Sequence, residues 1–318
     1  MALTSRVTLV GPDNEVEDIF SSSLGVIFTD DITNQHGDND HGILYTSPFL
    51  PRPFTITLNE PQGNDNRRLF SHYLWNASLL LAEYVERDCL SAAATAYAAD
   101  RADREARAAT PMRRLGMPDG HFDVRALRTL EMGAGTALPS IMSALLGARQ
   151  VVVTDYPAPE VIATLRDNVM RNTAAAYAPD AARRTPTDNV VVAGHEWGVF
   201  PADDAPAVLE KHAFDRVFVA DCLWMPWQHA NLRASINHFM ARDAAARAWI
   251  VAGFHTGREK MRGFFDAGEL AKEDLEVENI WERDCDGVER PWVLDRGVED
   301  ITERKRWLVV CVLKRPSV

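Results

Sequence analysis

The stretch of sequence that decides the fold is Leu130-Glu131-Met132-Gly133-Ala134-Gly135-Thr136-Ala137-Leu138-Pro139. It begins as an apolar strand, turns at two glycines and leads directly into an apolar helix. Gly133 and Gly135 allow a tight turn and let a ligand approach the backbone more closely than a Cβ would permit. Leu138 stands where the dinucleotide fingerprint has its third glycine, which favours a ligand without phosphates. Glu131 is placed to accept a hydrogen bond within the loop or from an amino group of the ligand.

A second signal follows 22 residues beyond Gly133, where the strand-like run 151–155 ends in the carboxylate of Asp155. An acid at that strand end can accept hydrogen bonds from both ribose hydroxyls of an adenosine-bearing ligand. The alternative is a helix cap, because Pro157 and a helical pattern follow closely. With the glycine turn upstream, we expect Asp155 to bind ribose.

Strand and helix patterns alternate through the carboxyl-terminal two thirds of the chain. We expect strands over residues 127–132, 150–155, 189–193, 215–221, 248–254, 275–281 and 307–313, and helices over 138–146, 158–172, 206–212, 228–240 and 259–270. Such alternation indicates parallel strands with crossover helices on both faces. The stretch 283–306 is polar and turn-rich with no clear helical face, which predicts that the last two strands are antiparallel. The expected fold is therefore α/β and Rossmann-like, with a seven-stranded, mostly parallel sheet and an antiparallel last strand. This is the plan of class I methyltransferases.

Two loops at the same sheet edge carry further candidates. Trp197, in Gly194-His195-Glu196-Trp197-Gly198, can stack on an adenine face, or it can be an ordinary core tryptophan. Ala220-Asp221-Cys222-Leu223-Trp224 places Asp221 at the carboxyl end of the central fourth strand, beside the switch point where such sheets hold ligands. We expect Asp221 to orient an acceptor amine and Trp224 to shape its pocket.

Three residues are weaker candidates for contacts with that acceptor. Trp227 and His229 follow Trp224 at once, and aromatic faces favour cations. Packing explains Trp227 equally well. His255 lies at the end of the fifth strand, where it can reach the acceptor or form the entry turn of the next helix.

Charge and composition exclude several classes of protein. A net charge of −12 over 318 residues, with a pI near 5.2, argues against a general nucleic-acid binder and leaves room for a basic protein partner. Four scattered cysteines suggest neither a disulfide framework nor a zinc site, and no run is apolar enough for a secretory signal or a membrane span. The metal-ligand types in 36–41 are typical of a polar loop. We expect a cytoplasmic protein with no bound metal.

The motifs at 131–138, 155–157, 194–198 and 220–224 together resemble the seven-strand lysine methyltransferase-like family. The likeness is greatest to its fungal branch, labelled nicotinamide N-methyltransferase-like, which includes an enzyme that methylates the N-terminal glycine and adjacent lysine of translation elongation factor 1-alpha. His72-Tyr73-Leu74-Trp75-Asn76-Ala77 resembles the family's pre-core tryptophan element, whose tryptophan lies against the cofactor. The resemblance implies S-adenosyl-L-methionine as cofactor, with contacts from Trp75, Glu131, Gly133, Gly135, Asp155, Trp197 and Ala220.

The resemblance says less about the acceptor. It implies an amine nitrogen of a protein, either a lysine or an N-terminal amine, with a translation factor among the candidate partners. Many relatives have Tyr or Phe where this chain has Trp224, and the stretches 91–114 and 283–306 are unlike a minimal lysine methyltransferase. A small-molecule N- or O-methyltransferase of fungal metabolism is therefore an alternative, as is a protein of this fold that does not methylate.

The chain divides into two parts on this interpretation. Residues 1–70 form an N-terminal extension with a short strand at 54–58, and residues 71–318 form the S-adenosylmethionine-binding domain. Within the second part, apolar residues at helical spacing over 71–86 predict a helix. The Ala/Arg-rich insertion at 91–115 mixes acids with its arginines, so we expect a solvated helix rather than a nucleic-acid arm.

Overall fold

The computed structural model describes residues 2–10, 34–37, 42–58, 73–105, 115–179, 189–200 and 207–317, with backbone alone for 91–105. Its strands are β1 (Val7–Val10), β2 (Gln35–His36), β3 (Gly42–Tyr45), β4 (Phe54–Ile56), β5 (Leu74–Trp75), β6 (Arg128–Met132), β7 (Gln150–Asp155), β8 (Val190–Gly194), β9 (Arg216–Ala220), β10 (Arg247–Gly253), β11 (Glu276–Asp284), β12 (Glu289–Pro291) and β13 (Trp307–Lys314). The α-helices are α3 (Asn76–Glu105), α4 (Leu138–Leu145), α5 (Pro159–Asn172), α6 (His229–Phe239), α7 (Arg258–Arg262), α8 (Ala267–Ala271) and α9 (Ile301–Arg306). Short 3₁₀ turns are η1 (Leu3–Arg6), η4 (Ala207–Leu209), η5 (Pro226–Gln228), η6 (Phe254–Thr256) and η7 (Gly263–Phe265).

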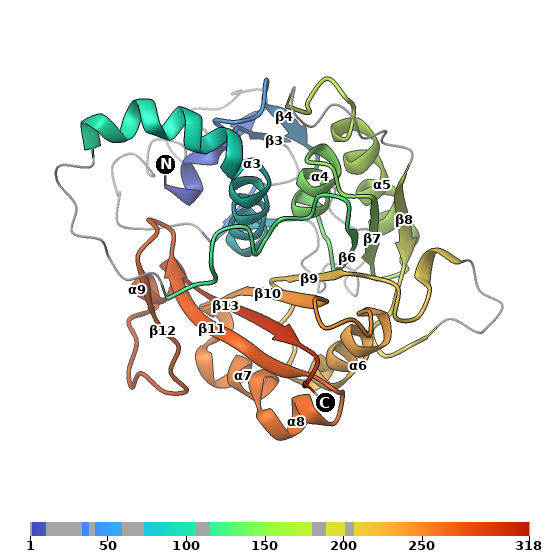
Figure 1. Ribbon diagram of the computed structural model, residues 1–318. Coiled ribbons are helices and arrows are strands. Elements are labelled where there is room, and N and C mark those ends of the chain that lie inside the picture. The colour runs from blue at the N-terminus through green and yellow to red at the C-terminus, as the bar shows by residue number, and fades with distance from the viewer. Residues whose placement is uncertain are drawn as a thin grey trace, which may run out of the picture.

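One large sheet organises the molecule, with the order β12-β11-β13-β10-β9-β6-β7-β8 (Figure 1). The five strands from β10 to β8 are parallel, and β13 runs antiparallel between β10 and β11. The expected seven-stranded sheet with its antiparallel last strand is therefore confirmed. A three-residue edge strand, β12, adds an eighth.

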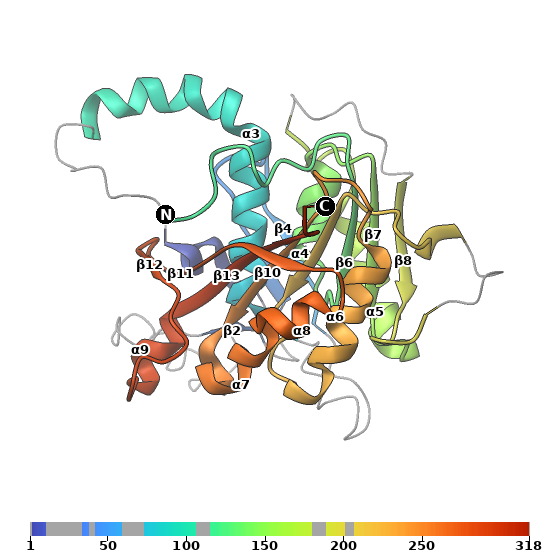
Figure 2. The same ribbon diagram turned by 60° about the horizontal axis from the view of Figure 1, so that its bottom comes forward.

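The strands are buried on both faces, as parallel strands between helices are. Along β10, Trp249 and Val251 face one hydrophobic cluster while Ala248 and Ile250 face the other. Helices α3, α4 and α5 cover the first face, and α6, α7 and α8 cover the second (Figures 1 and 2). This sandwich fixes where the carboxyl ends of the parallel strands lie.

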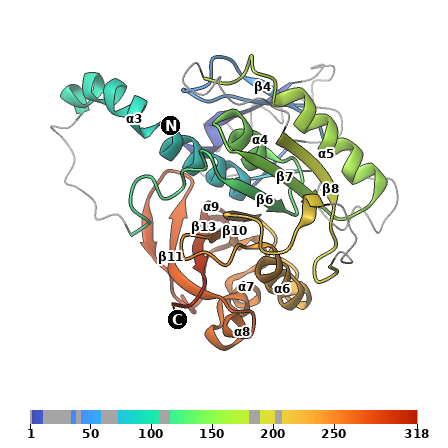
Figure 3. The ribbon, with the colours of Figure 1, turned by 45° about the vertical axis from the view of Figure 1, so that its right-hand side comes forward.

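The N-terminal segments form small sheets on the outside of this core. Strands β1, β3 and β4 make a three-stranded sheet whose β4 edge lies beside α5 (Figure 3). Asn168 of α5 ties the two together, because its side chain accepts from the amide of Thr57 at 2.8 Å and donates to that residue's carbonyl at 2.9 Å. The separate pair β2–β5 places Gln35 opposite Trp75.

The structure corrects two expected helices. Of the segment 206–212, the described residues form only the single turn η4, and the chain reverses at His212, whose φ is +55°. The helix expected over 259–270 is broken into α7, η7 and α8, and Asp266 caps α8 by accepting from the amide of Glu269. Gly263 begins η7, at the first of these breaks, where glycine weakens helix formation.

The expected absence of helix from 283–306 is also wrong in part. Strand β11 continues to Asp284, and a six-residue helix, α9, precedes β13. Asp300 caps that helix by accepting from the amides of Thr302 and Glu303, a cap that Asp300-Ile-Thr-Glu303 signals in the sequence. Upstream, α3 begins at Asn76 and continues through residues 91–105. The rest of the insertion, 106–114, lies outside the described residues.

A buried ion cluster holds the 283–306 stretch against the end of β10. Glu282 is fully buried in β11 and accepts hydrogen bonds from Arg258, Arg290 and Arg296. Arg258 starts α7, two residues after η6, and its guanidinium also lies 4.3 Å from the ring centre of Phe254. The cluster therefore fixes η6 at the carboxyl edge of the sheet.

Replacing Glu282 with alanine should lower the free energy of unfolding by about 3 kcal/mol, the lower end for breaking a buried ion pair, because three guanidinium groups lose this carboxylate while Arg258 and Arg290 keep Glu299. Urea denaturation measures this. The control is Lys272→Ala, which removes an exposed ion pair with Glu269 and should cost less than about 1 kcal/mol. Equal losses in the two variants would contradict a structural role for the cluster.

Candidate active site

A pocket opens at the carboxyl edge of the parallel strands, where β6 and β9 lie side by side. The chain leaves β6 toward β7 and β8 but leaves β9 toward β10, so this is the switch point of the sheet, the usual ligand site of such folds. The cavity is about 860 Å³, part of it open to solvent. It is lined by Tyr73, Trp75, Ser78, Gly133, Ala134, Gly135, Asp155, Tyr156, His195, Glu196, Trp197, Ala220, Asp221, Cys222, Trp224, Met225 and Gln228.

The glycine turn forms the floor of this pocket. Gly133 and Gly135 have φ values of +63° and +52°, which glycine adopts at little cost. A Cβ on Gly133 would lie 2.7 Å from Sγ of Cys222 and 3.0 Å from the ring of Trp197. Residue 133 therefore has no side chain because the loops after β8 and β9 occupy that space.

Asp155 joins the end of β7 to the glycine turn. Its Oδ2 accepts from the amide of Gly135 and its Oδ1 from the amide of Tyr156, both at 2.7 Å. Burial raises the pKa of Asp155, while the two amides oppose that rise. A carboxylate has about four lone-pair sites, so two remain for hydroxyl groups of a ligand.

Glu131 lies behind the pocket rather than in its lining. Its Oε2 accepts from the amide of Ser140 at 3.0 Å and from the same residue's hydroxyl. The Glu131 side chain thus ties β6 to the first turn of α4. Its Oε1 has no hydrogen-bond partner in the described part of the chain, and burial raises the pKa of Glu131 to about 8.

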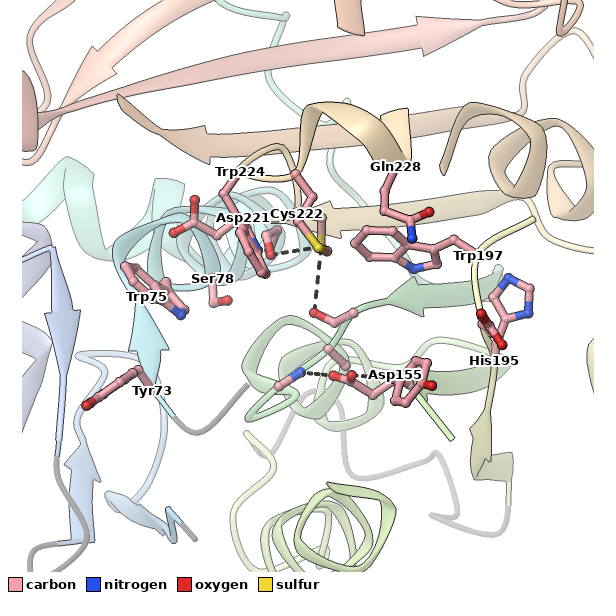
Figure 4. A pocket seen from close by; sticks show the side chains of 17 residues that line it. Tyr73, Trp75, Ser78, Asp155, His195, Trp197, Asp221, Cys222, Trp224 and Gln228 are labelled. Atoms are coloured by element: carbon pink, nitrogen blue, oxygen red, sulfur yellow. Dashed lines mark hydrogen bonds between the residues drawn. The ribbon is translucent and has the colours of Figure 1, made fainter. Parts of the chain in front are cut away.

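One end of the pocket is formed by the loop after β8. Figure 4 shows Trp197, His195 and Asp155 at this end. The hydroxyl of Ser235 in α6 anchors the loop, because it accepts from the amide of Gly198 at 2.9 Å and lies 3.1 Å from Nε2 of His195. Trp197 is thereby held across the glycine turn.

The other end combines residues from three distant segments. Figure 4 places Trp75, from β5, and Ser78, from the first turn of α3, near Asp221 and Trp224. Asp221 directly follows β9 with φ +60°, a conformation that aspartate tolerates better than most residues. Its Oδ1 accepts from the amide of Gly253 at 3.0 Å, and burial raises the pKa of its carboxyl.

Of the other residues suggested by the sequence, three lie outside the lining. Trp227 is 72% exposed in η5 and makes an edge-on contact with Trp224, 6.4 Å between ring centres. His229 is buried, and its Nε2 donates to the carbonyl of Leu223 at 3.0 Å, so it supports the loop after β9. His255 lies in η6, behind Trp75 and Asp221.

Sequence reasoning missed several lining residues, namely Tyr73, Ser78, Tyr156, Met225 and Gln228. Each of these residues lies in or within a few positions of a motif identified in the sequence. Their residue types alone do not indicate a role in ligand binding. Sequence reasoning also missed β2, where Nε2 of His36 donates a hydrogen bond of 2.7 Å to Oδ1 of Asn76, the residue next to Trp75.

The described residues contain no cluster of His, Cys, Asp and Glu suited to a metal ion, and His41 lies outside them. All four cysteines are buried and unpaired. Among the helices described, none is long and apolar enough to cross a membrane.

Three fungal relatives of this chain carry the same name, protein N-terminal and lysine N-methyltransferase EFM7. That of Gibberella zeae is 28% identical over 227 residues, covering 68% of this chain and 70% of its own length. The Schizosaccharomyces pombe protein is 28% identical over 245 residues, with coverage of 76% and 77%. The Kluyveromyces lactis protein is 33% identical over 189 residues, with coverage of 56% of each chain.

Residues 55–270 match the family model described as lysine methyltransferase, so the resemblance inferred from the motifs is confirmed. A putative SAM-dependent methyltransferase from Streptococcus mutans aligns in three dimensions over 89% of this chain and 57% of its own, with 9% identity and a TM-score of 0.45. The order and direction of the strands, rather than that overlap, identify the fold.

Replacing Gly133 with alanine should weaken binding of the pocket's ligand at least about fivefold, because overpacking costs about 1–3 kcal/mol and displaces Trp197 or Cys222. Calorimetry with S-adenosylmethionine and S-adenosylhomocysteine measures this. Gly263→Ala is the matched control, since its φ is −64° and no atom lies within 4 Å of the added Cβ. Unchanged affinity in Gly133→Ala would contradict the assignment of the turn as the ligand's floor.

Glu131 should make the protein less stable as the pH rises. Its pKa is about 8 in the fold against 4.5 for the free group, so folding takes up a proton between those values. The free energy of unfolding therefore falls through that window, by up to about 1.4 kcal/mol per pH unit. Urea denaturation from pH 5.5 to 7.5 should give a shallower decline for Glu131→Gln than for the wild type. Identical slopes would contradict the burial of a carboxyl that has no basic side chain beside it.

Proposed function

We propose that this chain, a member of the lysine methyltransferase family, methylates an amine nitrogen of a protein, either an N-terminal amine or a lysine. The chain is an S-adenosylmethionine-dependent methyltransferase. Support for a protein acceptor comes from the relatives, which are named for N-terminal and lysine methylation.

The residues of the pocket fit the cofactor. The side-chain-free floor at Gly133 would hold its central part, Asp155 its ribose hydroxyls and Trp197 its adenine. The lining contains three carboxylates, Asp155, Glu196 and Asp221, and no lysine or arginine among the described residues. Such a lining suits a cation and lacks the basic groups that bind phosphates.

That charge pattern is the observation that carries the proposal. Asp221 is buried, and the indole rings of Trp75 and Trp224 lie at the same end of the pocket. Aromatic faces and a carboxylate together favour an ammonium group over a neutral or anionic acceptor. An amine therefore fits this end better than a hydroxyl or a carboxylic acid does.

The cofactor supplies an electrophilic methyl group on a cationic sulfonium. Methyl transfer then needs alignment more than acid–base power, and orientation alone supplies much of such a rate. Asp221 accepts a hydrogen bond from the acceptor N–H and so points the nitrogen lone pair into the pocket. The indoles of Trp75 and Trp224 exclude water from the acceptor.

The acceptor must be uncharged when it reacts. An α-amino group, with a reference pKa near 8, is partly neutral at pH 7, whereas lysine near 10.4 requires a larger shift. An N-terminal amine therefore needs less help from this pocket than a lysine.

Asp221→Asn should lower kcat on the order of 100-fold while cofactor affinity stays within a few-fold, because only the acceptor loses its orienting charge. Asparagine also tolerates positive φ, so the backbone is kept. The control is Asp274→Asn, another aspartate of positive φ (+54°), which lies away from the pocket. Full turnover in Asp221→Asn would refute the role of Asp221.

The acceptor class is tested by incubating the enzyme with methyl-labelled cofactor and either a fungal cell extract or purified translation elongation factor 1-alpha. We expect the label in protein, at an N-terminal amine or a lysine located by mass spectrometry. Acetylation of the extract's amines beforehand should abolish labelling. Label found only in small molecules would overturn the proposal in favour of a small-molecule methyltransferase.

A further inference from the structure

His255 lies behind the acceptor end of the pocket and touches two of its walls. Its ring stacks on Trp75 with 4.8 Å between ring centres and 25° between planes. Its Nδ1 lies 3.8 Å from Oδ1 of Asp221. The lining of the pocket does not include His255 itself, so any effect it has on the reaction passes through these two neighbours.

The polar edge of this ring is unusual. Nδ1 is buried and has no hydrogen-bond partner in the described residues, although a buried polar atom normally finds one. Its separation from Asp221 is slightly too long for a hydrogen bond. Catalytic contacts are often long in the free enzyme and tighten when the ligands bind.

Gly253 provides the room for this arrangement. A Cβ there would lie 3.1 Å from Nδ1 of His255 and 3.7 Å from Oδ1 of Asp221. The φ of Gly253 is −80°, which any residue can adopt, so its backbone does not require glycine. The missing side chain leaves space for His255 to approach Asp221.

Within the described residues, the contacts of the Asp221 carboxylate involve one of its two oxygens. Both the amide of Gly253 and the ring of His255 face Oδ1. Within the described residues, this leaves Oδ2 for the acceptor. The ring of His255 also packs against the indole of Trp75. The backbone of Trp75 is held separately, by the pairing of β5 with β2.

We propose that His255 is a positioning residue for methyl transfer, with separate tasks for the edge and the face of its ring. The edge holds the Asp221 carboxylate by Oδ1, so that Oδ2 meets the acceptor amine. The face supports Trp75 as a wall that the cofactor and the acceptor share. The inference rests on the proposed function of this pocket and names a residue that serves it without touching substrate.

Two substitutions separate the two tasks. His255→Phe keeps a ring to stack on Trp75 but removes Nδ1. We expect kcat to fall at least about tenfold with cofactor affinity within twofold, since misplacement of a reacting group by about 1 Å costs on the order of 100-fold.

His255→Asn keeps an amide near the position of Nδ1 but removes the ring. We expect cofactor affinity to weaken roughly three- to tenfold, the value of an aromatic pair, with kcat less affected than in His255→Phe.

Gly253→Ala provides an independent test that leaves both side chains in place. The added methyl group separates His255 from Asp221, so this variant should repeat the fall in kcat of His255→Phe. It also replaces His255→Phe as the test if that variant unfolds. Gly263→Ala again controls for the effect of adding a methyl group.

Cofactor affinity by calorimetry and kcat and KM for the labelled protein acceptor are measured for each variant. Unchanged kcat in His255→Phe and Gly253→Ala would overturn the inference. Equal loss of the same parameters in His255→Phe and His255→Asn would also overturn it, because the ring would then be a structural support only. Failure of the proposed function shows differently, as a wild-type enzyme that binds cofactor yet methylates no protein.

Discussion

The site depends on a close approach between loops that leave three different strands. The turn after β6 has to pass beneath Trp197, which follows β8, and beside Cys222, which follows β9. A glycine at 133 is the only residue that meets both demands, because the position has positive φ and no space for a Cβ. Sγ of Cys222 lies 3.4 Å from the carbonyl oxygen of Met132, so the β9 loop rests directly on the end of β6. Without this approach, the cofactor end and the acceptor end of the pocket would not share a floor.

Buried carboxylates gathered around that floor give the site its electrostatic character. Burial raises the pKa of Asp155 and of Asp221, and within the described residues backbone amides rather than basic side chains donate hydrogen bonds to both carboxylates. Carboxylates in such surroundings lose hydration that a cation can replace. A cationic cofactor next to an amine acceptor offers that compensation at both ends of the pocket. The same arrangement would repel a phosphate-bearing dinucleotide, in agreement with Leu138 in place of a third glycine.

Local sequence patterns were sufficient to bring Gly133, Gly135 and Asp155 to one pocket, at the end that we propose binds the cofactor. Gly133, Gly135 and Asp155 belong to successive β/α units, and strand-end residues of neighbouring parallel strands necessarily meet at one edge. The strands themselves were predictable because apolar runs buried on both faces leave a clear signal. Local patterns failed where tertiary contacts decide. The segment 206–212 has apolar residues but only one 3₁₀ turn among those described. Helix α9 is a different case, because its cap at Asp300 is a local signal that the polar composition of the surrounding stretch obscured.

The acceptor end was less predictable because its parts come from segments far apart in the chain. Trp75 is placed by pairing with Gln35, about forty residues earlier, and by the ring of His255, which lies 180 residues later. η6, which carries His255, is in turn held by the Arg258–Glu282 pair, which Arg290 and Arg296 from the stretch 283–306 join. Change in these outer segments can therefore alter the acceptor end while the glycine turn and Asp155 stay as they are. It follows that the acceptor has to be inferred from the contacts among Trp75, Asp221 and His255, since the cofactor motifs are the same whatever amine is methylated.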